Sequence, residues 1–185
     1  MKNQKKTQKP IFSKKNMHAC AYPFLYEDIM VVDHELITDE IATLIGLLAS
    51  QVKDKKLHND LIWLVRLAWD INGSVRGKNA VSSEVYEQLV KMYQSYQDKT
   101  KIDKKRFTLP IGSFAPCLAE LVRNRCKQAV RTLYLVSKTT TVNQVLFDAL
   151  NVMSNLFYLI SLFIRIKNKE PIVTFASSSY KVIKK

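Results

Sequence analysis

Apolar residues recur at spacings of three and four over long stretches of this chain, and few glycines or prolines interrupt them. The clearest such stripe comprises Leu36, Ile37, Ile41, Leu44, Ile45, Leu48 and Val52. This spacing places apolar side chains on one face of an α-helix. With four glycines and five prolines among 185 residues, the chain has little material for the tight turns of a β-sandwich or barrel. The pattern therefore predicts an all-α fold.

The same periodicity, together with helix end signals, predicts four more helices. They span about residues 57–75, 82–96, 114–137 and 143–167. Long helices with short connections suit an up-and-down bundle of about five helices. A chain of this length favours a single domain. We therefore expect a basic flexible segment at 1–26, a helical bundle domain at 27–168 and a basic tail at 169–185.

The most apolar stretch, residues 145–164, is interrupted by polar side chains: Asp148, Asn151, Ser154 and Asn155. Such groups are costly in the hydrocarbon of a membrane. A buried core helix is the better interpretation, and no membrane partner is expected. Amides placed among apolar residues must find hydrogen-bond partners or a ligand. Asn151 and Asn155 are therefore either satisfied within the fold or candidates for ligand binding.

Lysine and arginine outnumber aspartate and glutamate by 29 to 16, which gives a formal net charge of +13. Six of the lysines lie between Lys2 and Lys15, and three more close the chain. Basic tails of this kind mostly keep a protein solvated. Nucleic acid is a possible partner on charge alone, but it is not the favoured one.

Several common chemistries lack their sequence signals. The three cysteines show no Cys-x-x-Cys spacing, and the three histidines form no His-Glu-x-x-His motif, so neither a disulfide framework nor a protein-bound metal is expected. Serine-hydrolase, Walker and Rossmann glycine motifs are missing. No apolar core of a signal peptide precedes Pro10, and we expect a cytoplasmic protein.

Arg123, Lys127 and Arg131 recur at a spacing of four, which lines three cations along one face of a helix. Such a face can hold a polyphosphate through charge-assisted hydrogen bonds. It can equally be a solvated basic surface, and the spacing alone does not decide between the two.

Three strings around these residues carry a family resemblance. RFTLPIGS, LVRNRCKQAVR and ALNVMSNLFYLI are similar, in order and separation, to the motifs Phe-x-Leu-Pro-Gly-Gly, Arg-x-x-Cys-Arg-Arg-Ala-Glu-Arg and Leu-Asn-Arg-Leu-Ser-Asp-x-Leu-Phe. These motifs belong to the PduO-type ATP:cob(I)alamin adenosyltransferases. The upstream ITDEIATLIGLL also resembles that family's Val-Asp-Glu-Leu-Asn helix. The resemblance covers about residues 35–168, most of the chain.

The resemblance implies a fold, a reaction and an assembly. The fold is a cobalamin adenosyltransferase-like bundle that assembles as a homotrimer with its active sites between subunits. The reaction transfers the 5′-deoxyadenosyl group of ATP, bound with Mg²⁺, to the cobalt of cob(I)alamin. Small molecules are thus the implied substrates, and cobalamin is one of them rather than a resident cofactor.

The resemblance also assigns roles to six residues. Phe107 matches the aromatic residue that presses on the corrinoid face and disfavours the lower axial ligand. Arg123 and Asp39 match an arginine and an aspartate that pair across the trimer interface beside ATP. Lys127 stands where the family has an arginine, which keeps the charge but loses the bidentate fork. The remaining two, Arg131 and Asn151, match residues that line the nucleotide site.

Departures from the family pattern concentrate on ATP binding. The N-terminal Thr-Gly-Asp-x-Gly-Thr segment, which wraps the triphosphate, has no counterpart in KNMHACAYPFLYEDIM. Family residues are also replaced by Ile111, Gln128, Val130, Val152 and Asn155. Fold is inherited more readily than activity. The alternatives are therefore a catalytically impaired homologue that binds a corrinoid or another partner, and a basic nucleic-acid-binding accessory protein.

Overall fold

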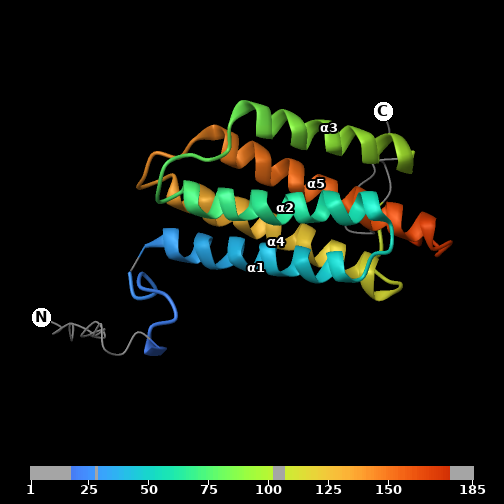
Figure 1. Ribbon diagram of the computed structural model, residues 1–185, viewed down its shortest axis with the longest axis horizontal. Helices are drawn as coiled ribbons and strands as arrows, with labels where there is room; N and C mark the ends of the chain where they lie inside the picture. The colour runs from blue at the N-terminus through green and yellow to red at the C-terminus, as the bar shows by residue number, and fades with distance from the viewer. Residues whose placement is uncertain (1–17, 28, 102–106, 176–185) are drawn as a thin grey trace, which may run out of the picture.

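In a computed structural model that describes residues 18–27, 29–101 and 107–175, the chain forms a bundle of long helices (Figure 1). The helices of the described part are α1 (Met30–Ser50), α2 (Lys55–Ser74), α3 (Ser83–Thr100), α4 (Phe114–Val136) and α5 (Gln144–Lys167). Consecutive helices run in opposite directions along the bundle. The all-α, up-and-down architecture expected from the apolar periodicity is confirmed.

The packing order of the helices differs from their order in the chain. α1 packs against α2 and α4, and α5 packs against α4 and α3. The core between them is made of fully buried aliphatic side chains from every helix, among them Ile41, Leu64, Leu89, Leu133 and Leu156. α4 and α5 therefore lie at the centre of the packing, next to each other, and the cations of α4 are placed beside α5.

Polar side chains fix the starts of three helices. Asp54 Oδ1 accepts a hydrogen bond from the Leu57 amide at 2.9 Å, and Ser82 Oγ accepts one from Val85 at 3.4 Å. Asn143 Oδ1 does the same for Val145 at 3.1 Å. Each satisfies an amide that the first helical turn leaves unpaired. The start of the third helix near Ser82 is thus confirmed. The first helix begins at Met30, six residues before the predicted stripe, because Val31 and Val32 extend its buried face.

α5 is long and apolar enough to cross a membrane by length and composition, but 61% of its most apolar window is buried inside the bundle. Its inward-facing residues include Met153, Phe157 and Ile160, none of them exposed. The prediction of a buried core helix is therefore confirmed.

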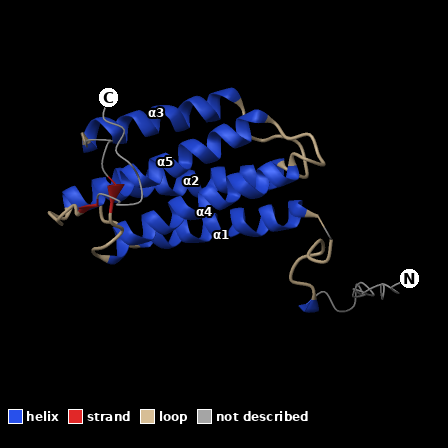
Figure 2. Cartoon of the chain, turned by 180° about the vertical axis from the view of Figure 1, so that it is seen from behind, coloured by secondary structure: helices blue, strands red, loops and turns tan. Residues whose placement is uncertain are grey.

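A short antiparallel ribbon crosses the end of the bundle where α4 begins and α5 ends. β1 (Phe107–Thr108) pairs with β2 (Thr174–Phe175) in the register Phe107 to Phe175 and Thr108 to Thr174 (Figure 2). Residues 169–175 therefore fold back onto the bundle, where the sequence suggested the beginning of a tail. The division of the chain at residues 26 and 168 otherwise stays a prediction, and residues 1–17 and 176–185 lie outside the described part.

The segment before α1 is held to the bundle around Arg76 and Glu35, and Tyr22 also hydrogen-bonds the Glu35 carboxylate. Arg76 forms two hydrogen bonds to the Glu35 carboxylate, at 2.9 and 3.0 Å, and a third to Glu27 at 2.9 Å. Its guanidinium also lies 4.2 Å from the centre of the Phe24 ring. These contacts hold the pKa of Glu35 below its ordinary value despite the opposing effect of burial. Sequence patterns gave no sign of this anchoring, because Arg76 and Glu35 are 41 residues apart.

Candidate functional site

The predicted cationic face exists on α4. Arg123, Lys127 and Arg131 all lie within the helix Phe114–Val136, so their Cα atoms rise over about 12 Å along one side. Arg123 is half-buried, whereas Lys127 and Arg131 are exposed. The arrangement offers one anchored cation and two that solvent can reach.

Arg123 is held by three contacts, two at its side chain and one at its backbone carbonyl. Its Nη1 donates to Glu120 Oε2 at 2.8 Å, and its guanidinium lies 4.8 Å from the centre of the Tyr158 ring. The Ser154 hydroxyl donates to the Arg123 carbonyl at 3.4 Å. Because Glu120 is only 5% exposed, its charge depends on Arg123 for compensation. Arg123 is therefore a fixed group that faces α5.

Glu120 and Tyr158 are site residues that the sequence reasoning missed. Glu120 precedes Arg123 by three residues, a spacing at which charges on a helix meet, and this signal could have identified it. Tyr158 carries no comparable signal, because its approach to Arg123 depends on how α4 packs against α5.

The other two cations differ in their surroundings. The pKa of Lys127 lies below its ordinary value, chiefly because of partial burial and secondly because of the positive charge on Arg123. The Arg131 guanidinium lies 5.6 Å from the Tyr134 ring centre. An anion placed along this face would relieve the repulsion that Lys127 experiences.

The expectation of buried amides on α5 is wrong for Asn151 and Asn155, since both are exposed. Asn151 Nδ2 donates to the Phe147 carbonyl at 2.9 Å, a bond within its own helix. Only Ser154 is buried, at 4% exposed. The helical phase explains the difference, because α4 and α3 cover α5 on other faces. Asn151 thus lies on the surface of the α4–α5 pair with one side free for a ligand or a second chain.

Asp39 lies on α1 and is exposed. It forms no ion pair with another described residue, and its neighbour Glu40 instead pairs with Arg125 at 3.0 Å. Arg123 is turned toward Tyr158 on α5. A contact between Asp39 and Arg123 within one chain is therefore not part of the structure, and any pairing of the two would need a second chain.

Phe107 starts β1, which precedes α4 at one end of the bundle. Arg131 lies seventeen residues into α4 from Phe114, which corresponds to about 26 Å along the helix. Within one chain, Phe107, the residue assigned to the corrinoid, therefore lies far from Arg131 at the other end of the cationic face. The six predicted residues do not form one compact site within a single chain.

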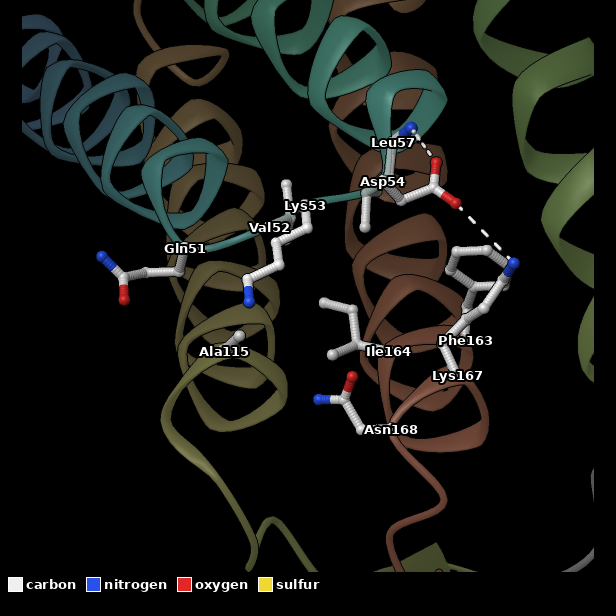
Figure 3. A pocket seen from close by; sticks show the side chains of 10 residues that line it. All are labelled: Gln51, Val52, Lys53, Asp54, Leu57, Ala115, Phe163, Ile164, Lys167 and Asn168. Atoms are coloured by element: carbon white, nitrogen blue, oxygen red, sulfur yellow. Dashed lines mark hydrogen bonds and ion pairs between the residues drawn. The ribbon is translucent and has the colours of Figure 1, made fainter.

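An open cavity of about 400 Å³ lies at the same end of the bundle as β1. The linker between α1 and α2 forms one wall, through Val52 and Lys53, and Ala115 of α4 and Ile164 of α5 form the others (Figure 3). Lys167 spans from α5 toward Asp54, with 3.8 Å between Nζ and Oδ2. Half of the lining residues are apolar, and the charged ones are Lys53, Asp54 and Lys167. None of the six predicted residues lines this cavity.

Within the described ranges, no three histidine, cysteine, aspartate or glutamate side chains are grouped so that they could hold a metal ion. The chemistry that the described side chains can offer is accordingly charge neutralisation along α4 and apolar contact at the bundle end.

The chain is similar to known proteins in both sequence and fold. A family model described as cobalamin adenosyltransferase matches residues 36–164. A search of curated protein sequences found no match. Among solved structures, a variant of the PduO-type ATP:corrinoid adenosyltransferase from Lactobacillus reuteri, complexed with cobalamin and ATP, is 17% identical with a TM-score of 0.73. The alignment covers 83% of this chain and 90% of that one.

A second variant of the Lactobacillus reuteri protein, complexed with ATP, is 19% identical with a TM-score of 0.72. It aligns over 82% of this chain and 90% of its own. These likenesses show a shared helical bundle fold. The family model reaches into all five helices and includes each of the six predicted residues. The chain belongs to the cobalamin adenosyltransferase family.

Proposed function

We propose that this protein transfers the 5′-deoxyadenosyl group of ATP to cob(I)alamin. The observation that carries the proposal is the family match over residues 36–164, which includes a cationic face retained on α4. Structures of similar fold contain cobalamin and ATP, in agreement with the two substrates. In the reaction, the cobalt attacks the 5′ carbon of ATP, a cobalt–carbon bond forms, and the carbon–oxygen bond to triphosphate breaks.

The chain's own residues would position the substrates and neutralise charge. Arg123, fixed by Glu120 and Tyr158, would meet the triphosphate, and Lys127 and Arg131 would extend that contact along α4. Asn151 would bind the nucleotide from the neighbouring helix. Phe107 would contact the corrinoid and favour loss of its lower axial ligand. Cobalamin supplies the nucleophile, and magnesium accompanies ATP.

We further propose that the active unit is a homotrimer with sites between subunits, located in the cytoplasm. Two observations support the assembly: Asp39 is exposed with no ion-pair partner among the described residues, and one chain cannot bring Phe107 close to Arg131. A second chain that presents its α1 to this α4 would supply Asp39 to Arg123.

A second candidate function is corrinoid binding without efficient turnover. The segment that occupies the place of the family's triphosphate loop is instead bound to Arg76 through Glu27 and Phe24, and Val130 and Val152 replace polar family residues. A lost hydrogen bond to a charged group costs about 1.5–3 kcal/mol. The loss of several would weaken ATP affinity by orders of magnitude, while the apolar corrinoid contact would be kept.

One pair of measurements tests the proposal. Purified protein is titrated separately with magnesium-ATP and with cobalamin, and adenosylcobalamin formation is followed after reduction of the cobalt. Turnover supports the transferase, cobalamin binding without turnover supports the second candidate, and binding of neither substrate refutes both.

Matched variants identify the site. Arg123→Ala leaves the buried Glu120 carboxylate without its partner, and we expect it to weaken ATP binding and assembly. Arg66→Ala removes an arginine from the exposed side of α2 and should leave both unchanged. Light scattering at micromolar concentration measures assembly, and a monomer mass for the unmodified chain would contradict the proposed trimer.

A further inference from the structure

The turn that joins β1 to α4 is held in place by the end of α5. The Leu109 amide donates to the Val173 carbonyl at 2.9 Å, next to the β1–β2 pairing. The Ser113 amide and hydroxyl donate to the two oxygens of the Glu170 carboxylate, at 3.1 and 2.5 Å. Because Ser113 is the N-cap of α4, Glu170 joins the start of α4 to the end of α5.

A buried arginine completes this attachment. Arg165 is 2% exposed, and its Nη1 donates to the Ile111 carbonyl. Its Nη2 is buried and has no hydrogen-bond partner among the described residues. Leaving a guanidinium in this state is unfavourable unless a nearby charge and a fixed geometry compensate. The nearby negative charge is Glu170, which forms no direct ion pair with Arg165; the pKa of Glu170 is held below its ordinary value first by the Ser113 hydroxyl, with a smaller contribution from the charge of Arg165.

At Gly112 the turn lies in close contact with the side chains of Arg165 and Glu170. The φ of Gly112, +145°, is a backbone conformation that residues with side chains rarely adopt. A Cβ added there would lie 2.6 Å from Arg165 Nη1 and 2.9 Å from Glu170 Oε2. The turn can therefore lie against both Arg165 and Glu170 only because residue 112 has no side chain.

The position of Glu170 is itself fixed by the way α5 ends. Lys169 has a φ of +57°, and the Glu170 amide donates to the Arg165 carbonyl at 2.9 Å. Asn168 Nδ2 donates to Glu170 Oε1 at 2.9 Å. The end of α5 thus turns back so that the carboxylate faces the start of α4.

We propose that Arg165 and Glu170 are positioning residues for the corrinoid end of the site. They act through the turn at residues 109–113, which fixes the backbone of β1 and therefore of Phe107 relative to α4. This inference rests on the proposed function, because the role of Phe107 belongs to it. Arg123 lies nine residues into α4 from Phe114, about 13 Å along the helix, so a change in the turn should alter corrinoid use and leave ATP binding intact.

The first test needs no substrate. Glu170→Gln keeps the shape of the side chain but replaces one accepting oxygen with a donor, and Gly112→Ala displaces the same turn without removing either charge. In hydrogen-exchange mass spectrometry, we expect residues 107–113 to exchange at least about tenfold faster in both variants. Glu87→Gln, which removes an exposed carboxylate from α3, is the matched control and should exchange as the unmodified chain does.

The second test measures function in the same preparations. We expect the cobalamin KM, or the cobalamin Kd if turnover is slow, to rise about tenfold in Glu170→Gln and Gly112→Ala, while the ATP KM or Kd changes less than about twofold. The absorption spectrum of bound cob(II)alamin should also shift toward the form that retains its lower axial ligand. A role limited to general stability would move neither the ratio of the two constants nor this spectrum.

The outcomes separate the inference from the function on which it rests. Unchanged exchange at 107–113 shows that Glu170 does not hold the turn, and this overturns the inference. Faster exchange with equal changes in both substrates, or with none, overturns the positioning role. If the unmodified chain binds no cobalamin, the proposed function and the positioning role both fail, and the exchange data then describe a purely structural attachment.

Discussion

Replacement of His34 should remove a defined part of the pH dependence of stability. His34 lies on α1 facing α4 and is completely buried. Its Nδ1 lies 3.2 Å from the Ala129 carbonyl and 3.1 Å from Thr132 Oγ1, and its Nε2 has no hydrogen-bond partner in the part of the chain that the structure describes. Protonation would therefore create a buried charge and a second N–H without an acceptor. Burial accordingly lowers the pKa of His34 from 6.5 to about 4.

The sign of the effect follows from these two pKa values. As the pH falls below 6.5, the unfolded chain binds a proton that the folded chain does not bind until about pH 4. The free energy of unfolding therefore decreases across this window. For a pKa near 6.5 unfolded and near 4 folded, the loss between about pH 7.5 and about pH 5 is about 2 kcal/mol.

Urea denaturation at these two pH values and at one fixed protein concentration measures the loss. His34→Gln can still donate to Ala129 but cannot titrate, so its loss should be about 2 kcal/mol smaller than that of the unmodified chain. His58→Gln, which removes an exposed histidine, should behave as the unmodified chain. Equal losses for the unmodified chain and His34→Gln would show that the buried imidazole is not what couples folding to pH.

Three further outcomes are expected. Arg76→Met should lower the free energy of unfolding by about 3 kcal/mol, since the buried Glu35 carboxylate loses its partner. Replacement of both Arg76 and Glu35 by methionine should recover part of this loss, as measured by urea denaturation. Gly46→Ala should raise the free energy of unfolding by about 1 kcal/mol, because an added Cβ meets nothing within 4 Å inside α1. A lower melting temperature in this variant would contradict the expectation. Burial raises the pKa of the Cys126 thiol to about 12, so a thiol reagent should modify the other two cysteines in the folded chain and Cys126 only after unfolding.

The apolar periodicity of the sequence predicted where the helices lie, but not which faces of α5 are buried. The stripe from Leu36 to Val52 predicted the body of α1 but missed its first six residues and ran two residues past its end. The body was predictable because burial of one face recurs in every turn and is therefore encoded locally. The same reasoning placed three cations on one face of α4, since a spacing of four fixes their direction whatever surrounds them. It was wrong about Asn151 and Asn155, because apolar neighbours in sequence do not show which side of α5 the other helices cover.

The sequence by itself determined the class of fold, the approximate helices and the family motifs around Arg123 and Phe107. These are properties of spacing, and spacing is set by the backbone geometry of a helix. Only the tertiary structure decided which groups meet: Arg76 with Glu35, Arg123 with Tyr158, and Arg165 and Glu170 with the turn at Gly112. Each of these contacts joins residues that are 35 to 58 positions apart in the chain. Such contacts depend on the packing of whole helices, and no local pattern encodes that packing.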